Sequence, residues 1–355
     1  MRFVDLLFVD RRPGAILCVF AFVIVTAVLE QPVHAESSVQ APVAETLQGE
    51  LKVMVFPGGF NWPIWAAQEN GFFTAEGLKV SLTYTTSSVE QISSLMAGNH
   101  QIAMTAVDNV VAYVEGAGEA ELDEPADIFA FMGGDDGFLS LIVQGEVTRF
   151  KDLEGRELAV DAMTTGYAFV LRKMLQHGGV SEDKVNFVSV GGALQRMDAM
   201  KQGKYAGTVL MTPFDIVAEL NGMNQLLKAS DMFDHYQGVV GAARRSWAAS
   251  HNRELVSYIR AYRKGLRWLY DFRNKQAAQA ILMQHLPQVT GSLAERIYAV
   301  LLAPEGGFEP NASLDMEGLQ TVLDLRNQFG DGTVSLNEPS RYYDSMFYDQ
   351  AISSH

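Results

Sequence analysis

The sequence predicts an α/β protein made of two similar halves and a helix-rich C-terminal part. From Leu51 to Gly116, strand-like and helix-like patterns alternate, and nearly every strand ends in a short Gly, Ser, Thr or Asn loop that opens the next helix. The same alternation restarts at Asp152 and continues to Leu220. Loops of this kind form small-molecule sites in open α/β sheets, so we expect the protein to hold a small solute.

The first half shows its elements clearly. Leu78, Val80, Leu82 and Tyr84 alternate with polar residues, as a half-buried strand requires. Strands are expected at 51–56, 78–84, 101–105, 128–132 and 138–143. Helices are expected to begin at Pro63, Ser88 and Val107, the first two ending at Gly71 and Gly98.

The second half repeats the design, and a helical tail follows it. Strands are expected at 157–160, 185–190, 208–211 and 238–243, and helices at 167–176, 193–202, 213–220, 255–272, 275–285, 293–302 and 314–329. The tail most simply packs onto the first half, so the chain would cross twice between the halves, near Gln144–Gly145 and near Gly238–Gly241. The predicted domains are therefore 51–144 with 242–355, and 145–241.

The N-terminus resembles an export signal. Arg11 and Arg12 precede an apolar run of about 15 residues, and Val33-His34-Ala35 offers small residues for cleavage. We expect residues 1–35 to be a signal peptide, cleaved near Ala35 in ordinary secretion to the periplasm, and 36–50 to be a flexible spacer. One alternative is a retained membrane anchor, but a membrane-spanning helix needs about 20 apolar residues, more than this run contains. The other alternative is export by the twin-arginine route.

The length and the net charge of the chain limit its number of domains and the partners that it can bind. The chain has 355 residues, 48% of them hydrophobic, and a net charge of −15. Two domains are the default at this size, and an acidic surface disfavours nucleic acid and anionic membranes as partners. The only cysteine, Cys18, lies in the expected signal, so the mature chain would lack disulfides and a thiol nucleophile.

Four motifs of the sequence are specific enough to compare with a known family. The most specific motif runs from Ala67 to Phe73 and on through Glu76-Gly77-Leu78 to Val80. The other three are Leu95–Ala103, Asp152–Arg156 and Met211–Phe214. Together they resemble segments of the periplasmic solute-binding proteins of ABC importers that handle sulfonate, taurine, nitrate and thiamin-pyrimidine precursors, the SsuA/THI5-like proteins. Gln101 stands where an aspartate is common in that family.

The resemblance covers roughly residues 51–270. It implies a type II periplasmic binding protein with two α/β lobes, no enzymatic activity, an ABC permease and ATPase as partners, and a monomer without stable membrane insertion. Fungal relatives that synthesise the thiamin pyrimidine carry a cysteine-rich motif, which this mature chain cannot supply. The alternatives are such a biosynthetic enzyme and a sensory binding module.

In a two-lobed binder, the cleft is lined by loops at the carboxyl ends of the strands. Six loops qualify: 57–62, 85–88, 105–109, 133–138, 161–167 and 211–215. The candidate ligand-binding residues are Phe60, Asn61, Trp62, Trp65, Ser87, Ser88, Asp108, Asn109, Asp135, Asp136, Phe138, Thr164, Thr165, Gly166, Tyr167, Phe214 and Asp215. Core packing is the alternative for Trp65, and helix capping is the alternative for the serines, the threonines, Asp108 and Asp215.

The six loops contain aromatic residues but no Lys, Arg or His. This balance favours a flat aromatic, heterocyclic or amine-bearing solute. An alkanesulfonate or taurine-type ligand stays open, because backbone amides at helix N-termini can hold a sulfonate. No metal-ligand, nucleotide-binding or catalytic motif is present, so we expect no catalytic residue, metal or cofactor.

Overall fold

The computed structural model describes residues 50–122, 124–304, 306–330, 332 and 335–353. All of them belong to one compact unit, residues 44–355. The expected signal peptide and nearly all of the expected spacer lie outside the described residues. Glu50, expected to end the spacer, already belongs to the first strand. No helix among the described residues has the length and apolar character needed to cross a membrane.

The first of two sheets has the strand order β2-β1-β3-β10-β4. β1 runs parallel to β2 and β3, whereas β10 is antiparallel to β3 and β4. β3 and β4 are almost entirely buried, while the edge strand β2 keeps the polar alternation seen in the sequence. The strands are β1 (Glu50–Val55), β2 (Lys79–Tyr84), β3 (Ile102–Ala106), β4 (Ile128–Gly133) and β10 (Val239–Arg244).

The second sheet has the order β7-β6-β8-β5-β9. β6 runs parallel to β7 and β8, and β5 is antiparallel to β8 and β9. Each sheet thus combines parallel strands with one strand that returns from the other half of the chain. The strands are β5 (Leu139–Val143), β6 (Glu157–Val160), β7 (Asn186–Ser189), β8 (Gly207–Met211) and β9 (Asn224–Lys228).

Of the two connections between the sheets, the second ends at Gly238, near its expected position, and the first does not match. β5 was expected in the first half but lies in the second sheet, so the first connection is the glycine-rich loop 134–138 and its placement near Gln144–Gly145 is wrong. β4 and β5 are both buried apolar strands joined by a short loop. The sequence alone cannot show whether they pair in one sheet as a hairpin or belong to two different sheets. The second connection, residues 229–238, follows β9. The sequence of this half-buried edge strand lacks the alternation of apolar and polar residues that predicts a strand.

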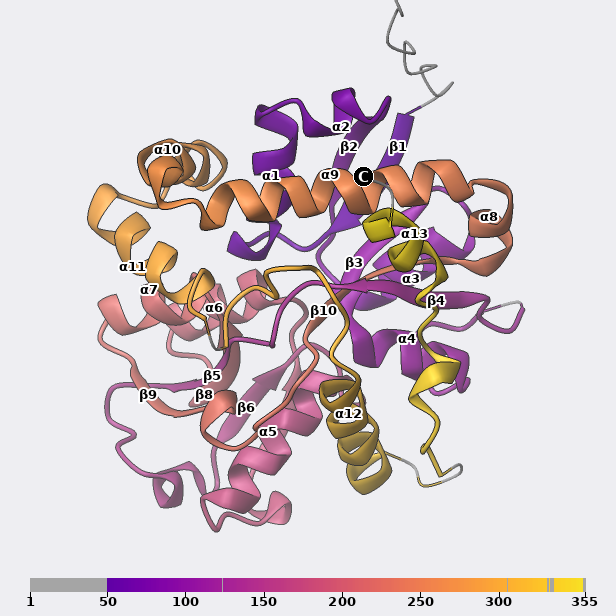
Figure 1. The fold of residues 1–355 in the computed structure, drawn as a ribbon. Coiled ribbons are helices and arrows are strands. Elements are labelled where there is room, and N and C mark those ends of the chain that lie inside the picture. The colour runs from indigo at the N-terminus through magenta and orange to yellow at the C-terminus, as the bar shows by residue number, and fades with distance from the viewer. Residues whose placement is uncertain (1–49, 123, 305, 331, 333–334, 354–355) are drawn as a thin grey trace, which may run out of the picture. The chain divides into compact units, whose positions relative to one another are not determined.

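Helices cover both sheets (Figure 1). On the first sheet lie α1 (Trp62–Glu69), α2 (Phe72–Ala75), α3 (Ser88–Met96), α4 (Val107–Val114), α8 (Arg245–Ser250), the long α9 (Asn252–Tyr270) and α13 (Met346–Ser353), while α10 (Lys275–His285) packs on α1. On the second sheet lie α5 (Gly166–His177), α6 (Ala193–Lys201) and α7 (Phe214–Leu220). Single-turn helices occur at Gly59–Asn61, Phe150–Leu153, Glu182–Lys184, Ala229–Asp231, Phe272–Asn274 and Pro339–Arg341.

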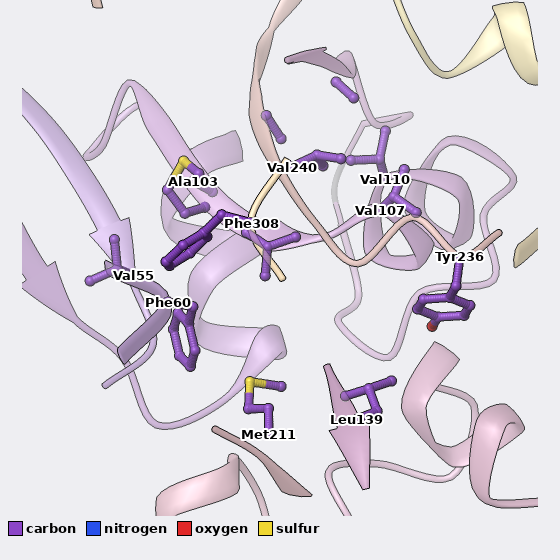
Figure 2. Close-up of a cluster of buried hydrophobic side chains, with 14 of the residues drawn as sticks. Val55, Phe60, Ala103, Val107, Val110, Leu139, Met211, Tyr236, Val240 and Phe308 are labelled. Atoms are coloured by element: carbon purple, nitrogen blue, oxygen red, sulfur yellow. The ribbon is translucent and has the colours of Figure 1, made fainter. Parts of the chain in front are cut away.

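Two tail helices contradict the expectation that the whole tail packs onto the first half. α11 (Gly291–Leu301) contacts α7, and α12 (Met316–Phe329) packs against α5 as well as α4. Buried hydrophobic side chains form one continuous cluster through the described residues. Figure 2 shows a part of this cluster, which includes Val55 and Ala103 of the first sheet and Met211 and Leu139 of the second.

Candidate functional site

A pocket lies where the carboxyl ends of parallel strands from both sheets meet. Thr105 and Ala106 line it at the end of β3, Asp161 follows β6, and Met211 ends β8. Its cavity volume is about 50 Å³ in this structure, below the range typical of small-molecule sites. Because neither sheet forms this pocket alone, its size and shape depend on how the two sheets face each other.

Five of the residues predicted from the sequence line this pocket. Phe60 and Asn109 come from the first-sheet side, and Thr165, Gly166 and Tyr167 come from the start of α5. Asn109 donates from Nδ2 to Thr105 Oγ1 at 2.8 Å, which fixes its side chain at the wall. Four of the six predicted loops contribute residues to the pocket. This agrees with the rule that loops after the strands line the cleft.

Aromatic rings form much of the wall. Phe56 and Phe60 face the pocket from the first-sheet side and Tyr167 from the second-sheet side. Burial, followed by the nearby Asp135, raises the pKa of Tyr167 well above its ordinary value. Its hydroxyl therefore stays protonated, and the wall offers apolar faces together with a neutral phenol.

Arg196 is a pocket residue that the sequence analysis missed. It lies on α6, is 3% exposed, and lines the pocket. Its guanidinium donates to Gly191 O at 2.6 Å, Thr208 Oγ1 at 3.0 Å and Val209 O at 3.1 Å. The expectation that the cleft has no cationic side chain is therefore wrong. The missed signal was the Gly191-Gly192 pair, a strand-end loop after β7 like the six chosen loops.

The charge of Arg196 is only partly compensated within the protein. Burial lowers its pKa, and the carboxylate of Asp161 opposes that shift. Among the described residues, no carboxylate lies within ion-pair distance of this guanidinium, and its three acceptors are neutral. A buried cation in this situation gains free energy when an anionic or strongly accepting group enters the pocket.

Direct polar contacts join the two sides around the pocket. Ser88 donates from Oγ to Asp161 Oδ2 at 2.9 Å, and the Gly192 amide donates to Thr86 O at 3.0 Å. Glu119 Oε1 accepts from both the amide and the hydroxyl of Thr164, at 3.0 and 2.7 Å. Ser88 and Thr164, both predicted ligand residues, thus hold the two sides together, and the structure is a closed arrangement.

Asp108 lies beside the pocket but is engaged elsewhere. Its carboxylate, in a residue that is 1% exposed, accepts two hydrogen bonds from Arg326 of α12, at 2.8 and 2.6 Å. The partner is 218 residues away in the sequence, so no local pattern could reveal it. Asp108 does not line the pocket.

Three residues predicted for the first wall are core residues instead. Trp62 donates from Nε1 to Ala278 O at 3.0 Å and is fully buried. Trp65 donates to the Tyr84 hydroxyl at 3.2 Å and stacks on His285 with ring centroids 4.5 Å apart. Asn61 donates to Phe56 O at 2.7 Å and shapes the turn. α1 turns the two tryptophan side chains away from the pocket, toward α10.

Three further candidates have local structural roles. Ser87 caps α3 by accepting the Glu90 amide at 3.2 Å, as the capping alternative requires. Phe138 packs edge-on against Phe308 at 5.9 Å, and Phe214 is buried at the start of α7. None of these side chains lines the pocket.

The remaining aspartates also lie outside the pocket. Asp215 accepts from the Ile216 amide at 2.8 Å and from Thr212 Oγ1 at 3.2 Å, and burial raises its pKa to about 6. Burial and the nearby Glu309 raise the pKa of Asp136 to about 6. Among the described residues, no group of His, Cys, Asp and Glu is arranged to hold a metal ion.

Asp135 ties the two connections between the sheets together. Its Oδ1 accepts from the Gly137 amide at 2.9 Å and from the Val239 amide at 3.1 Å, and its carbonyl accepts from the Gly238 amide. The Asp135 side chain is 2% exposed. Burial raises its pKa to about 7, although the two amide hydrogen bonds act in the opposite direction.

Asp135→Asn is expected to make stability less dependent on pH. Since the pKa of Asp135 is higher in the folded state than its ordinary value of 3.8, the folded state holds the proton more tightly. That stabilisation is complete below the ordinary pKa and is lost as the pH rises to about 7. Urea unfolding from pH 4 to pH 8 should show a smaller decline for the variant. A decline equal to that of the wild type would contradict this assignment.

The arrangement of two mixed sheets with a pocket between them is the periplasmic binding protein fold, as expected from the sequence. The model of the "NMT1/THI5 like" family matches residues 61–272, more than half of the chain. The chain belongs to this family, which confirms the resemblance drawn from its motifs. The search of curated proteins gave no match.

Solved structures share this fold at low sequence identity. A Bordetella bronchiseptica RB50 protein is 15% identical with a TM-score of 0.72, over 86% of this chain and 97% of the other. The periplasmic nitrate-binding protein NrtA from Synechocystis PCC 6803 is 12% identical with a TM-score of 0.70, over 86% and 88%. The alkanesulfonate-binding protein SsuA from Xanthomonas axonopodis pv. citri, bound to MOPS, is 13% identical with a TM-score of 0.66, over 83% and 98%.

Proposed function

We propose that this protein is the extracytoplasmic solute-binding component of an ABC importer, and that it captures a small organic molecule between two lobes. The observation that carries the proposal is the pocket, because residues from both sheets line it. The lobes would be residues 50–133 with most of 239–353, and residues 139–228. The connections 134–138 and 229–238 would act as hinges, and opening the lobes would expose the pocket to solvent.

The family and the structural relatives support this role. The chain belongs to the NMT1/THI5-like family, and similar structures include a nitrate-binding and an alkanesulfonate-binding protein. A periplasmic location, a monomeric state, and a permease with its ATPase as partners follow from this role as parts of the proposal. The signal-like N-terminus supports the location.

We infer binding rather than catalysis. The pocket lining has one carboxylate, Asp161, and no histidine, lysine or cysteine among the described residues. It therefore lacks the Ser–His, Cys–His and lysine arrangements that often supply a nucleophile and its base. Incubating a bound solute with the protein and recovering it unaltered would support this inference. A converted product would favour the biosynthetic alternative. Permease genes near the coding gene would favour transport over a sensory role.

The pocket supports a solute with a flat apolar body and one anionic or accepting end. The rings of Phe56, Phe60 and Tyr167 suit an aromatic or heterocyclic body. Arg196 is the specific observation that favours the second candidate, an alkanesulfonate-type ligand, over a simple amine. Asp161 could still accept from an amino group, so a solute carrying both charges is compatible with the pocket.

A thermal-shift screen of heterocycles, sulfonates and amines tests the function. A solute that fits should raise the melting temperature in proportion to the logarithm of its concentration. Arg196→Met is expected to weaken binding of an acidic hit by about 10- to 100-fold, because charge-assisted hydrogen bonds are lost. Lys201→Met, exposed at the end of the same helix, is the matched control. No stabilisation by any class of solute would contradict the proposal.

A further inference from the structure

Helix α12 begins at the second connection between the sheets. The Asp315 amide, just before the helix, donates to Gln237 Oε1 at 2.8 Å. At Gly318, in the first turn, a side chain would lie only 2.5 Å from the Gln237 nitrogen. The helix therefore starts in direct contact with the backbone of the proposed hinge.

The C-terminal half of α12 packs on α5 of the second sheet (Figure 1). Phe329 stacks on Phe169 with ring centroids 6.3 Å apart, and its carbonyl accepts from Arg172 at 3.3 Å. Gln328 accepts from Lys173 at 3.1 Å and donates to Gln176 at 2.9 Å. These contacts attach the end of α12 to the second lobe.

Arg326 projects from this helix across the boundary between the lobes. It donates to both carboxylate oxygens of Asp108, which opens α4 of the first lobe, at 2.8 and 2.6 Å. It also donates to Thr164 O of the second lobe at 2.9 Å, and its guanidinium lies 5.0 Å from the centre of the Phe169 ring. The Arg326 and Asp108 side chains are 5% and 2% exposed. The pair is therefore excluded from water in the closed arrangement.

We propose that α12 is a latch that moves with the second lobe and whose Arg326 grips Asp108 only when the lobes are closed. This inference rests on the proposed function, because it requires the lobes to move. In an open form, water would solvate Asp108, whereas in the closed form its carboxylate is buried and needs a cationic partner. Loss of Arg326 would therefore leave a buried carboxylate without its partner in the closed form and disfavour closure.

The latch acts on closure independently of contact with the solute, because neither Arg326 nor Asp108 lines the pocket. A solute binds the closed form with an apparent affinity set by the fraction of molecules able to close. Weakening the latch should therefore lower affinity for every solute by the same factor, whereas a pocket residue changes affinity for particular solutes. This difference distinguishes the latch from a binding residue.

Pulsed electron–electron spin resonance can measure closure without a known ligand. Spin labels at Thr74→Cys and Gln202→Cys, which are exposed positions on the two lobes, would be placed in the full chain with Cys18→Ser. Arg326→Gln is expected to raise the ratio of long to short distances by about tenfold or more, as charge-assisted hydrogen bonds are lost. Arg273→Gln, whose exposed side chain pairs with nearby Asp271 and with no other carboxylate of the described residues, should leave the ratio unchanged.

Asp108→Asn keeps the side-chain shape and provides the same test if Arg326→Gln does not fold. It should shift the ratio in the same direction, because it removes the counter-charge of the buried Arg326 cation in the closed form. An unchanged ratio in a folded variant, with the wild type showing two distances, would overturn the latch alone. A single unchanging distance in every variant would overturn both the latch and the proposed motion, whereas solute binding is tested separately by the thermal-shift screen.

Discussion

Replacing Trp62 with alanine is expected to lower the free energy of unfolding by about 3–5 kcal/mol. The indole is fully buried, packs edge-on against Tyr298 at 5.9 Å and donates to Ala278 O at 3.0 Å. The substitution would leave a large cavity between α1 and α10 and remove the hydrogen bond to the Ala278 carbonyl. Urea unfolding followed by circular dichroism measures the change.

Trp247→Ala is the matched control for this prediction. Trp247 is only partly buried and stacks on His251 with centroids 4.9 Å apart, so its loss should cost much less. If Trp62 instead contacted the ligand, as its position in a strand-end loop predicts, Trp62→Ala would impair binding with little effect on stability. Equal costs for the two variants would contradict the core assignment.

Gly166→Ala is expected to weaken solute binding by about 10- to 100-fold, because overpacking typically costs about 1–3 kcal/mol. A Cβ atom at Gly166 would lie 2.5 Å from the Cβ of Asp108 and 2.7 Å from its Cγ. Asp108 is held by Arg326 and cannot swing away. The start of α5 would therefore be pushed away from α4, and the lobes could not close fully.

Titration of a hit from the thermal-shift screen measures this effect. Gly291→Ala is the control, since a Cβ there would meet nothing within 4 Å. The unfolding energy of Gly166→Ala should change less than its affinity, because an open form relieves the clash. Unchanged affinity would show that close approach of α5 to Asp108 is unnecessary for binding.

Most helices and strands could be predicted because their signals lie within a few neighbouring residues. These signals are glycine at helix ends, alternation of apolar and polar residues in strands, and capping residues at helix starts. The helix Val107–Val114 begins at its expected residue, and the strand Glu157–Val160 matches its expected bounds. The same local logic located Phe60, Asn109 and the Thr165–Tyr167 segment at the pocket, since loops after parallel strands meet at one edge of a sheet. Whether these residues bind a solute remains a prediction.

The errors concern contacts between distant parts of the chain. β5 changes sheet by pairing with β8 and β9, and Trp62 finds its partner Ala278 216 residues later. Asp108 has the residue type and the loop position expected of a ligand-binding residue, but its carboxylate is paired with Arg326 from the C-terminal part of the chain. Arg196 lines the pocket from inside α6. The rule used for the prediction covers only the loops that follow strands, so it does not include this residue. Such outcomes depend on tertiary packing rather than on spacing in the sequence.

Native mass spectrometry of the protein purified from exporting cells tests most directly the claim that the lobes enclose a small solute. We predict that the wild type carries an additional small mass, released on denaturation, and that Gly166→Ala carries markedly less of it. The same small molecule retained equally by both, or a wild type that carries none and gains none from any class of solute added, would contradict the account.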